Sequence, residues 1–441
     1  MLYPAFFRSV IWMVVIVVPC IFTSCRSSGS PSYNRKVFIS HEGGKYVLYR
    51  NNRPYLIKGA AGFENLHRLQ LSGGNTIRVW DTVNLKQVLD EAYANNIAVI
   101  AGLPMPVSGI LSYYNDRSKV TAQLNAFRSI VKKYSTHPAL LMWCLGNEVD
   151  FPYKPRFNNF YKAYRNLLKM IHEEDPDHPV TTALINFERR CIFNLCMKVP
   201  DLDLISLNTF GSLYSLQKDL NQFSWFWNGP FLITEWGVKG PWEADLTAWR
   251  APIEYNSTVK AEQYLRLYEH SMPVKDPRFL GAFVFLWGHK QEVTHTWFNL
   301  FDVTGYTSET VNVMQYLWTG KWPAHKAPQI KDMMLDGKQA KDNIILNSKT
   351  EHTAEVFLQQ IPDDTARIHW EILKEDWYAR NWYEPNTKKP SGHDSLLLTL
   401  KGYKVLFRTP EKEGPYRIFA TFSDARGYFA SANIPFYVVE Q

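Results

Sequence analysis

The sequence lacks the dense runs of positive charge that mark many nucleic-acid-binding proteins. Its basic residues form only short pairs, such as Lys132-Lys133 and Lys388-Lys389. A formal net charge of +7 is therefore spread along the chain, whereas a nucleic-acid-binding protein concentrates its charge on one face or stripe. We expect a mildly basic surface and no nucleic-acid partner.

Cysteine is scarce, and its spacing argues against a zinc site. The five cysteines are Cys20, Cys25, Cys144, Cys191 and Cys196, and the last three do not follow the spacing of zinc ligands. Cys191 and Cys196 are near enough in sequence to form a disulfide, but the sequence does not decide whether they do. Cys144 lies in an apolar run, where a buried thiol is the ordinary outcome. We expect neither a metal nor a cofactor.

Aromatic residues, in contrast, are abundant, at 15% of the chain with 15 Trp and 24 Tyr. Many of them will be core residues, because each buries a large apolar area. Tryptophan at this density is also typical of a cleft that stacks against flat apolar faces, which sugar rings present. At 441 residues the chain is too long for one ordinary core, so we expect two domains or a barrel with an accessory module.

The amino terminus has the pattern of a secretion signal. Arg8 is followed by an apolar stretch from Val10 to Phe22. This stretch is shorter than the roughly 20 residues of a bilayer-spanning helix, and it has the length of a signal-peptide core. Ser24-Cys25 and a polar segment over residues 26–32 follow. Small residues before a cysteine, and then a polar tether, resemble a bacterial lipoprotein signal.

This resemblance implies that Cys25 is lipidated after cleavage and becomes the first mature residue. We therefore expect a signal peptide over 1–24, a tether over 25–35, and a location outside the cytoplasm on a bacterial membrane, the outer membrane being favoured. The alternatives are an ordinary signal peptide and an uncleaved anchor helix, and both also place the rest of the chain outside the cytoplasm.

From residue 36 the pattern predicts a short hairpin and then a (β/α)8 barrel up to residue 325. Short apolar runs alternate with amphipathic stretches such as Val120–Tyr134 and Phe157–His172, the pattern of βαβ units. Eight strands over about 235 residues match the usual size of such a barrel. An open doubly wound sheet is the alternative, but Gly59-Ala60-Ala61-Gly62 is a weak phosphate-binding turn. The expected strands are Tyr55–Lys58, Thr76–Trp80, Ala98–Leu103, Leu140–Leu145, Val180–Ala183, Leu204–Leu207, Phe231–Thr234 and Ala282–Leu286.

The last part of the chain, residues 326–441, has a different pattern. Two prolines, Pro323 and Pro328, mark a linker, and the helical spacing disappears beyond them. Short β-prone runs separated by turn residues predict a β-sandwich of about one hundred residues. Its Trp370, Trp377 and Trp382 are either sugar contacts or, more simply, buried core residues.

Two glutamates stand directly after predicted strands. Leu140–Leu145 runs into Gly146-Asn147-Glu148, and Phe231–Thr234 runs into Glu235. Active sites of parallel barrels lie at the carboxyl ends of the strands. Strands four and seven can therefore present two carboxylates across the barrel mouth, as cleavage of a glycosidic bond requires. Each glutamate alone would be a solvated loop residue or an ion-pair partner; the two together favour a catalytic pair.

These segments resemble a known superfamily. Gly146-Asn147-Glu148 and Thr234-Glu235-Trp236-Gly237 are similar to the signatures of retaining glycosidases that carry glutamates on strands four and seven. His137–Trp143 and Gly74–Arg78 are similar to segments of the catalytic barrel of family 2 glycoside hydrolases. The resemblance covers residues from about 45 to 325. It implies a (β/α)8 barrel that cleaves β-linked glycosides.

The same resemblance implies a role for each matching residue. Glu148 would be the general acid/base and Glu235 the nucleophile. Asn147 would hydrogen-bond the 2-hydroxyl of the sugar, and Arg78 would lie beneath Glu235 and hold it ionised. Trp287, at the end of the eighth strand, would be a platform for the sugar, with a core indole as the alternative.

Further substrate contacts are expected from the ends of strands six, seven and eight. Asn208 ends the sixth strand, where the superfamily often has Tyr or His, and Trp236 follows the nucleophile. The polar and aromatic run from Trp287 to Trp297 predicts a binding loop, with Gln291 and Glu292 as candidates. Lone histidines in such a loop are more often polar contacts than metal ligands.

The sequence thus predicts a retaining hydrolase of β-linked oligo- or polysaccharides that works through a covalent glycosyl-enzyme. A transglycosylase with the same carboxylates is a close alternative. A non-catalytic glycan-binding lipoprotein is a weaker one, because both carboxylates are present.

Overall fold

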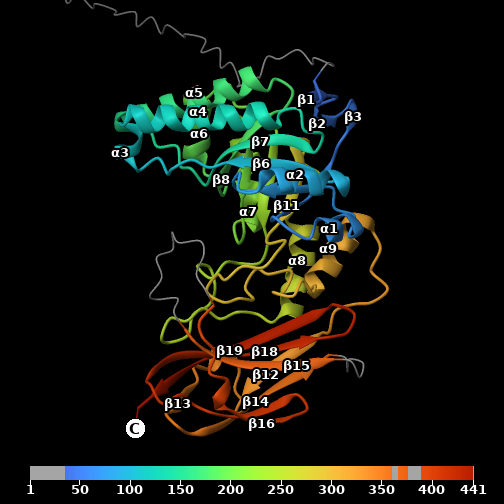
Figure 1. The fold of residues 1–441 in the computed structure, drawn as a ribbon, viewed down its shortest axis with the longest axis vertical. Helices are drawn as coiled ribbons and strands as arrows, with labels where there is room; N and C mark the ends of the chain where they lie inside the picture. The colour runs from blue at the N-terminus through green and yellow to red at the C-terminus, as the bar shows by residue number, and fades with distance from the viewer. Residues whose placement is uncertain (1–34, 360–365, 376–388, 441) are drawn as a thin grey trace, which may run out of the picture.

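The protein, seen here in a computed structural model, is described for residues 35–359, 366–375 and 389–440. The predicted signal peptide with Cys25, and also Trp377 and Trp382, lie outside these ranges. A barrel surrounded by helices is followed by a unit made of two sheets (Figure 1). Within the described ranges, no helix combines the length and hydrophobicity that crossing a bilayer requires.

The described part of the chain begins with the predicted hairpin, here a three-stranded antiparallel sheet. Its strands are β1 (Val37–Glu42), β2 (Lys45–Arg50) and β3 (Arg53–Pro54). The sheet bonds to loops that precede barrel strands, with Val37 N donating to Asp177 O at 3.1 Å and Tyr46 N to Pro277 O at 2.7 Å. It therefore covers the end of the barrel opposite the carboxyl ends of the strands.

Eight parallel strands form the closed barrel, which confirms the predicted fold class. Each of them overlaps one predicted strand. The strands could be located from the sequence because a strand that is buried on both faces appears as a continuous apolar run. The order around the barrel follows the chain, with β11 pairing to both β10 and β4. The strands are β4 (Ile57–Ala61), β5 (Thr76–Val79), β6 (Ala98–Leu103), β7 (Leu140–Asn147), β8 (Val180–Ile185), β9 (Leu204–Asn208), β10 (Phe231–Trp236) and β11 (Phe279–Val284).

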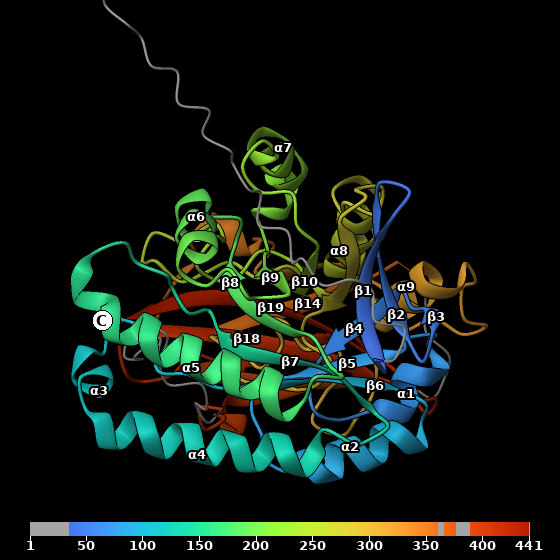
Figure 2. The same ribbon diagram turned by 90° about the horizontal axis from the view of Figure 1, so that it is seen from above.

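Helices surround the barrel, and the two longest match the predicted amphipathic segments. In α4 the N-cap Asp116 accepts hydrogen bonds from Ser118 N and Lys119 N, which satisfies donors of the first turn. Figure 2 shows α2, α4, α5, α6, α7 and α8 around the strands, with the sandwich beyond them. The helices are α1 (Leu66–Leu71), α2 (Leu85–Ala94), α3 (Leu111–Tyr114), α4 (Arg117–Tyr134), α5 (Asn158–Glu174), α6 (Arg189–Lys198), α7 (Leu213–Phe223), α8 (Ser257–His270) and α9 (Glu309–Thr319).

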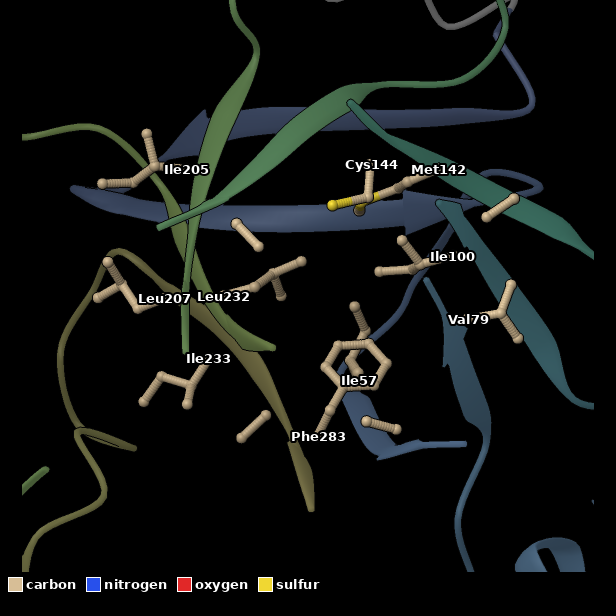
Figure 3. Packing of buried hydrophobic residues seen from close by; sticks show 14 of the residues in the cluster. Ile57, Val79, Ile100, Met142, Cys144, Ile205, Leu207, Leu232, Ile233 and Phe283 are labelled. Atoms are coloured by element: carbon tan, nitrogen blue, oxygen red, sulfur yellow. The ribbon is translucent and has the colours of Figure 1, made fainter. Parts of the chain in front are cut away.

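The barrel core is one continuous apolar cluster of strand and helix side chains. Figure 3 shows part of it, with side chains from several barrel strands packed together. Gly59 is required here for space, because a Cβ at this position would lie 2.4 Å from the Phe283 ring. Cys144 is a buried free thiol in this core, as expected.

The carboxyl-terminal unit contains two four-stranded sheets around a second apolar cluster, consistent with the predicted sandwich. Trp370 is buried in this cluster, which favours its core role over a sugar contact. One sheet has the order β12-β14-β17-β16 and the other β13-β19-β18-β15. The strands are β12 (Ile330–Leu335), β13 (Ile345–Asn347), β14 (Glu351–Leu358), β15 (Arg367–Lys374), β16 (Leu397–Lys401), β17 (Lys404–Arg408), β18 (Gly414–Ser423) and β19 (Phe429–Val439).

The sandwich packs against segments that follow barrel strands β10 and β11. Arg417 Nη2 donates to Pro252 O at 2.6 Å, and Ser431 N donates to Ser257 Oγ at 3.0 Å. Thr307 N donates to Gly427 O at 2.9 Å. The sandwich therefore lies at the carboxyl ends of the barrel strands, the end where a barrel active site is expected.

Candidate active site

The two glutamates lie at the carboxyl ends of their strands. Glu235 is the fifth residue of β10, and Glu148 follows directly after the last residue of β7. Glu148 has a positive φ of 54°, which is uncommon for a non-glycine residue and is often found at functional sites. Its backbone N–H donates to Ala183 O at 2.9 Å, which holds this conformation against the neighbouring strand.

Asn208, at the end of β9, links the two carboxylates. Its Nδ2 donates to Glu148 Oε1 and to Glu235 Oε1, each at 2.9 Å. Because both oxygens lie 2.9 Å from one nitrogen atom, they can be no more than 5.8 Å apart, which is twice that distance. Thr234 Oγ1 donates to Asn208 Oδ1 at 2.9 Å and so orients the amide with its nitrogen toward the acids.

Three donors hold Glu235, and all of them reach the same oxygen. Arg78 Nη1 forms an ion pair with Oε1, and Trp80 Nε1 donates to Oε1 at 2.7 Å. Asn208 is the third donor. Oε2 has no hydrogen-bond donor among the described residues. The arrangement gathers three donors on Oε1 and therefore leaves the other oxygen of Glu235 available to react.

Arg78 also fixes Asn147. Its Nη2 donates to Asn147 Oδ1 at 2.5 Å, so one guanidinium holds both the carboxylate and the amide. Since the amide oxygen is occupied, the amide nitrogen of Asn147 remains for another acceptor. Arg78 is fully buried and lies 5.0 Å from the Trp80 ring centre. It therefore contacts the carboxylate of Glu235 from within the barrel core, and its role in holding Glu235 stays a prediction.

Glu148 has a different environment from Glu235. Burial, first, and the negative charge of Glu235, second, raise the pKa of Glu148 above its ordinary value. The Asn208 hydrogen bond and the Arg78 charge act in the opposite direction, and the charge of Glu292 raises the pKa further. The pKa of one carboxyl of the pair is thus raised, while the other carboxyl is held by a guanidinium. Such a division separates an acid from a nucleophile.

Two tryptophans expected at the substrate lie elsewhere, and these predictions were wrong. Trp236 is fully buried and packs against Tyr264 and Tyr268 of α8. Successive side chains of a strand alternate between faces, so Trp236 points to the helices because Glu235 points to the mouth. Trp287 is also fully buried, donates through Nε1 to Asn65 O at 3.2 Å, and is a core indole at the barrel rim.

Gln291 and Glu292 lie on the loop that follows β11. Both are partly exposed, and Glu292 pairs with Lys290 at 2.6 Å between Oε2 and Nζ. The charge of Glu292 is the smallest of the effects that raise the pKa of Glu148. The contact of the loop with a substrate stays a prediction.

Sequence reasoning missed an aromatic face on the nucleophile side of the mouth. Trp80 lies 5.3 Å from Phe63 and 6.0 Å from Phe285, measured between ring centres. Phe285 contacts Phe210, which in turn contacts Trp242. Phe63 and Trp242 are 40% and 52% exposed, so the face ends in two rings open to solvent. The spacing of Arg78 and Trp80 could have predicted that Trp80 lies on the same face as Arg78, because residues two apart on a strand share a face.

The described residues contain no group of three or more His, Cys, Asp or Glu side chains arranged to hold a metal ion. The structure brings together the two carboxylates, with amide, guanidinium and indole donors around them.

Residues 78–291 match the model of the glycosyl hydrolases family 2, TIM barrel domain. No curated protein matches the chain. Three similar solved structures show the shared fold.

A β-glucuronidase from Bifidobacterium dentium, complexed with coumarin-3-O-glucuronide, has a TM-score of 0.52 at 16% identity over 65% of this chain and 49% of that one. A β-galacturonidase from Eisenbergiella tayi, bound to galacturonate, has a TM-score of 0.51 at 15% identity over 65% and 55%. A β-glucuronidase from Bacteroides uniformis has a TM-score of 0.50 at 12% identity over 92% and 48%.

The chain thus spans about half the length of these structures. The chain is thus similar to the family 2 barrel domain over residues 78–291, and the solved structures share its fold.

Proposed function

We propose that this protein is a retaining hydrolase of β-linked glycosides, with Glu148 as general acid/base and Glu235 as nucleophile. The observation that carries the proposal is the single Asn208 nitrogen that bonds both carboxylates and limits the separation of the bonded oxygens to 5.8 Å. Retaining enzymes hold the two carboxyl groups about 5–5.5 Å apart, whereas inverting enzymes need about 6.5–9.5 Å for a water molecule. The limit favours the retaining geometry.

In the first step, Glu235 Oε2 attacks the anomeric carbon while Glu148 transfers its proton to the leaving oxygen. The bond between that carbon and the leaving oxygen breaks, the leaving group departs as an alcohol, and a glycosyl ester forms on Glu235. In the second step, Glu148 takes a proton from water, whose oxygen attacks the same carbon and releases Glu235. The raised pKa of Glu148 moves this carboxyl in the direction that suits a general acid.

The donors around Glu235 fit this sequence of steps. Arg78, Trp80 and Asn208 all bond Oε1, so the oxygen that attacks is not tied by a hydrogen bond among the described residues. The same donors stabilise the carboxylate when the ester is cleaved and Glu235 becomes charged again. Positioning the reacting oxygen in this way lowers the entropic part of the barrier.

Turnover of a panel of aryl β-glycosides with different sugars tests the proposal. Native protein should release the aryl group from at least one substrate. Glu235→Gln should abolish turnover, and Glu148→Gln should lower kcat/KM by about 10²–10⁴-fold, the usual contribution of a general acid. Glu42→Gln, on the hairpin at the far end of the barrel, is the matched control and should keep native rates. Equal activity of Glu235→Gln and native protein would remove Glu235 from the mechanism.

We also propose that lipidated Cys25 attaches the enzyme to the outer membrane. The support is the apolar stretch that ends in Ser24-Cys25 before a polar tether. The full chain expressed in a Gram-negative bacterium should partition with detergent, and the mass of its first peptide should include acyl chains. Cys25→Ser should lose both properties. Detergent partitioning of the serine variant equal to that of the native chain would contradict the proposal.

A further inference from the structure

An apolar patch lies on the surface between helices α6 and α7. Phe193 and Met197, about one turn apart on α6, are 40% and 63% exposed, and Trp225, just after α7, is 75% exposed. The Phe226 ring joins them, with its centre 4.9 Å from that of Phe193 and 5.8 Å from that of Trp225. We call these four residues the α6–α7 patch. Exposed apolar side chains that cluster in this way mark a surface that binds a partner or a membrane.

The α6–α7 patch lies toward the amino ends of the barrel strands. The loop that carries Trp225 leads into β10, and Arg278 Nη1, from the loop before β11, donates to Trp227 O at 3.4 Å. Pro277, next to Arg278, accepts a hydrogen bond from Tyr46 of the hairpin at 2.7 Å. The hairpin with which the described chain begins is therefore at the same end of the barrel as the patch.

A short stretch of chain joins this end of the barrel to the proposed lipid anchor. Arg35 is ten positions after Cys25 (35 − 25), and ten residues span at most about 36 Å when fully extended. An acyl chain on Cys25 would thus keep the patch close to the bilayer, so that contact between them becomes an intramolecular event. Under this condition, a patch with only a weak affinity for lipid is sufficient.

The charge of α6 matches a bilayer that contains anionic lipids. The helix carries Arg189, Arg190 and Lys198 and has no acidic residue. Asp219 of α7 offsets one of these charges, because it pairs with Arg189 at 3.6 Å. Basic residues beside Trp, Phe and other apolar side chains are typical of surfaces that bind anionic membranes. A symmetric dimer through the patch would instead bring two copies of this basic helix together.

We propose that the α6–α7 patch inserts among the headgroups of an anionic lipid bilayer and so orients the lipid-anchored enzyme. The amino ends of the barrel strands then face the bilayer, whereas Glu148 and Glu235, at the carboxyl ends, face away from it. The mouth of the barrel stays open to substrates in the aqueous phase. This inference rests on the proposed attachment through Cys25.

Photoactivatable lipids test the contact directly. The full chain with its acyl chains is reconstituted in vesicles of phosphatidylethanolamine and phosphatidylglycerol that include a lipid with a diazirine next to its headgroup. After illumination, mass spectrometry should find label in the peptides that contain Phe193–Lys198 and Trp225–Phe226. Replacing phosphatidylglycerol with phosphatidylcholine should lower this labelling, because the basic residues of α6 lose their anionic partners. Labelling that does not depend on the anionic lipid would contradict the charge argument and overturn the proposal.

A charge placed in the patch should remove the contact. Trp225→Asp should lower labelling of the peptide that contains Met197 about tenfold, and it should fold normally because residue 225 is exposed, which thermal unfolding checks. Leu400→Asp is the matched control at an exposed position of β16 in the sandwich, and it should keep native labelling. Unchanged labelling in Trp225→Asp, or the same loss in both variants, would overturn the proposal.

The mass of the first peptide decides the attachment independently of the patch. Acyl chains on Cys25 without label on the patch would leave the attachment intact and overturn this inference. A chain without acyl chains would contradict the attachment, and labelling alone would then decide whether the patch binds lipid. An unlabelled patch, together with a dimer in detergent that Trp225→Asp dissociates, would assign the patch to a second copy of the chain and overturn the proposal.

Discussion

Arg78 and Glu235 form an ion pair in which the two side chains are only 1% and 7% exposed. A buried pair of this kind costs desolvation energy, so its presence at a strand end points to function rather than to stability. The same guanidinium holds Asn147, and the same carboxylate oxygen accepts from Trp80 and Asn208. The site is thus organised around the charge on Glu235.

Removing the cation should leave that charge buried without its partner. We expect Arg78→Met to lower the free energy of unfolding by about 3–5 kcal/mol at pH 7, the usual cost of breaking a buried pair. Adding Glu235→Gln should recover most of the loss, because the carboxamide carries no charge. Urea unfolding of the two variants measures both values. A double variant as unstable as Arg78→Met would contradict this account.

Asn208 should affect the pH profile as well as the rate. Its hydrogen bond lowers the pKa of Glu148, so Asn208→Ala should raise that pKa further. The first step needs protonated Glu148, and activity should therefore persist to higher pH while kcat falls, because Glu235 loses one donor. The basic limb of kcat/KM against pH reports the shift. A basic limb that moves to lower pH would disagree with the role assigned to Asn208.

The buried carboxyl group of Glu148 should lower the folding stability of the protein at neutral pH. Its pKa is raised above 4.5 in the folded state, so the folded protein binds this proton more tightly than the unfolded chain does. Stability is then lost as the pH rises above the unfolded value. Glu148→Gln should be more stable than native protein at pH 7 and equally stable near pH 3. Thermal unfolding at the two pH values checks this, and a difference of the same size at both would count against it.

The contribution of Glu371 to folding stability should depend on pH in the opposite way. Burial raises its pKa, but His295 and Lys389 outweigh burial and lower the pKa from 4.5 to about 2. The stabilisation from this carboxylate is therefore complete above pH 4.5 and is lost as the pH falls toward 2. Glu371→Gln should be less stable than native by about 2 kcal/mol at pH 7, and the gap should narrow below pH 4. A gap independent of pH would show that the charge is not the cause.

The sequence predicted the barrel strands and both glutamates because each signal is local. A strand buried on both faces is a continuous apolar run, and the residue after such a run lies at the end where barrels bind substrates. Trp236 was misplaced although the same local rule, alternation of faces, places it on the helix side once Glu235 faces the mouth. The arrangement of Asn208 and Thr234 depends on side-chain contacts across strands, which no local pattern contains.

The contact between His295 and Glu371 shows most clearly what could not be predicted from the sequence. These residues lie in different parts of the fold, and nothing near either position indicates the partner. Likewise, Trp287 directly follows a predicted strand, but β11 already ends at Val284 and the indole donates to Asn65 O. Tertiary packing determines such positions, so the sandwich could be predicted as a unit, but its contact with the loop after β11 could not.

The most direct test of the central claim is the stereochemistry of the first product. Proton NMR of the reaction, started with native enzyme and an aryl β-glycoside that it cleaves, distinguishes the anomers before they equilibrate. Two carboxylates as close as Asn208 holds Glu148 and Glu235 predict that the β anomer of the free sugar appears first, since two displacements at one carbon restore its configuration. Initial release of the α anomer would contradict double displacement.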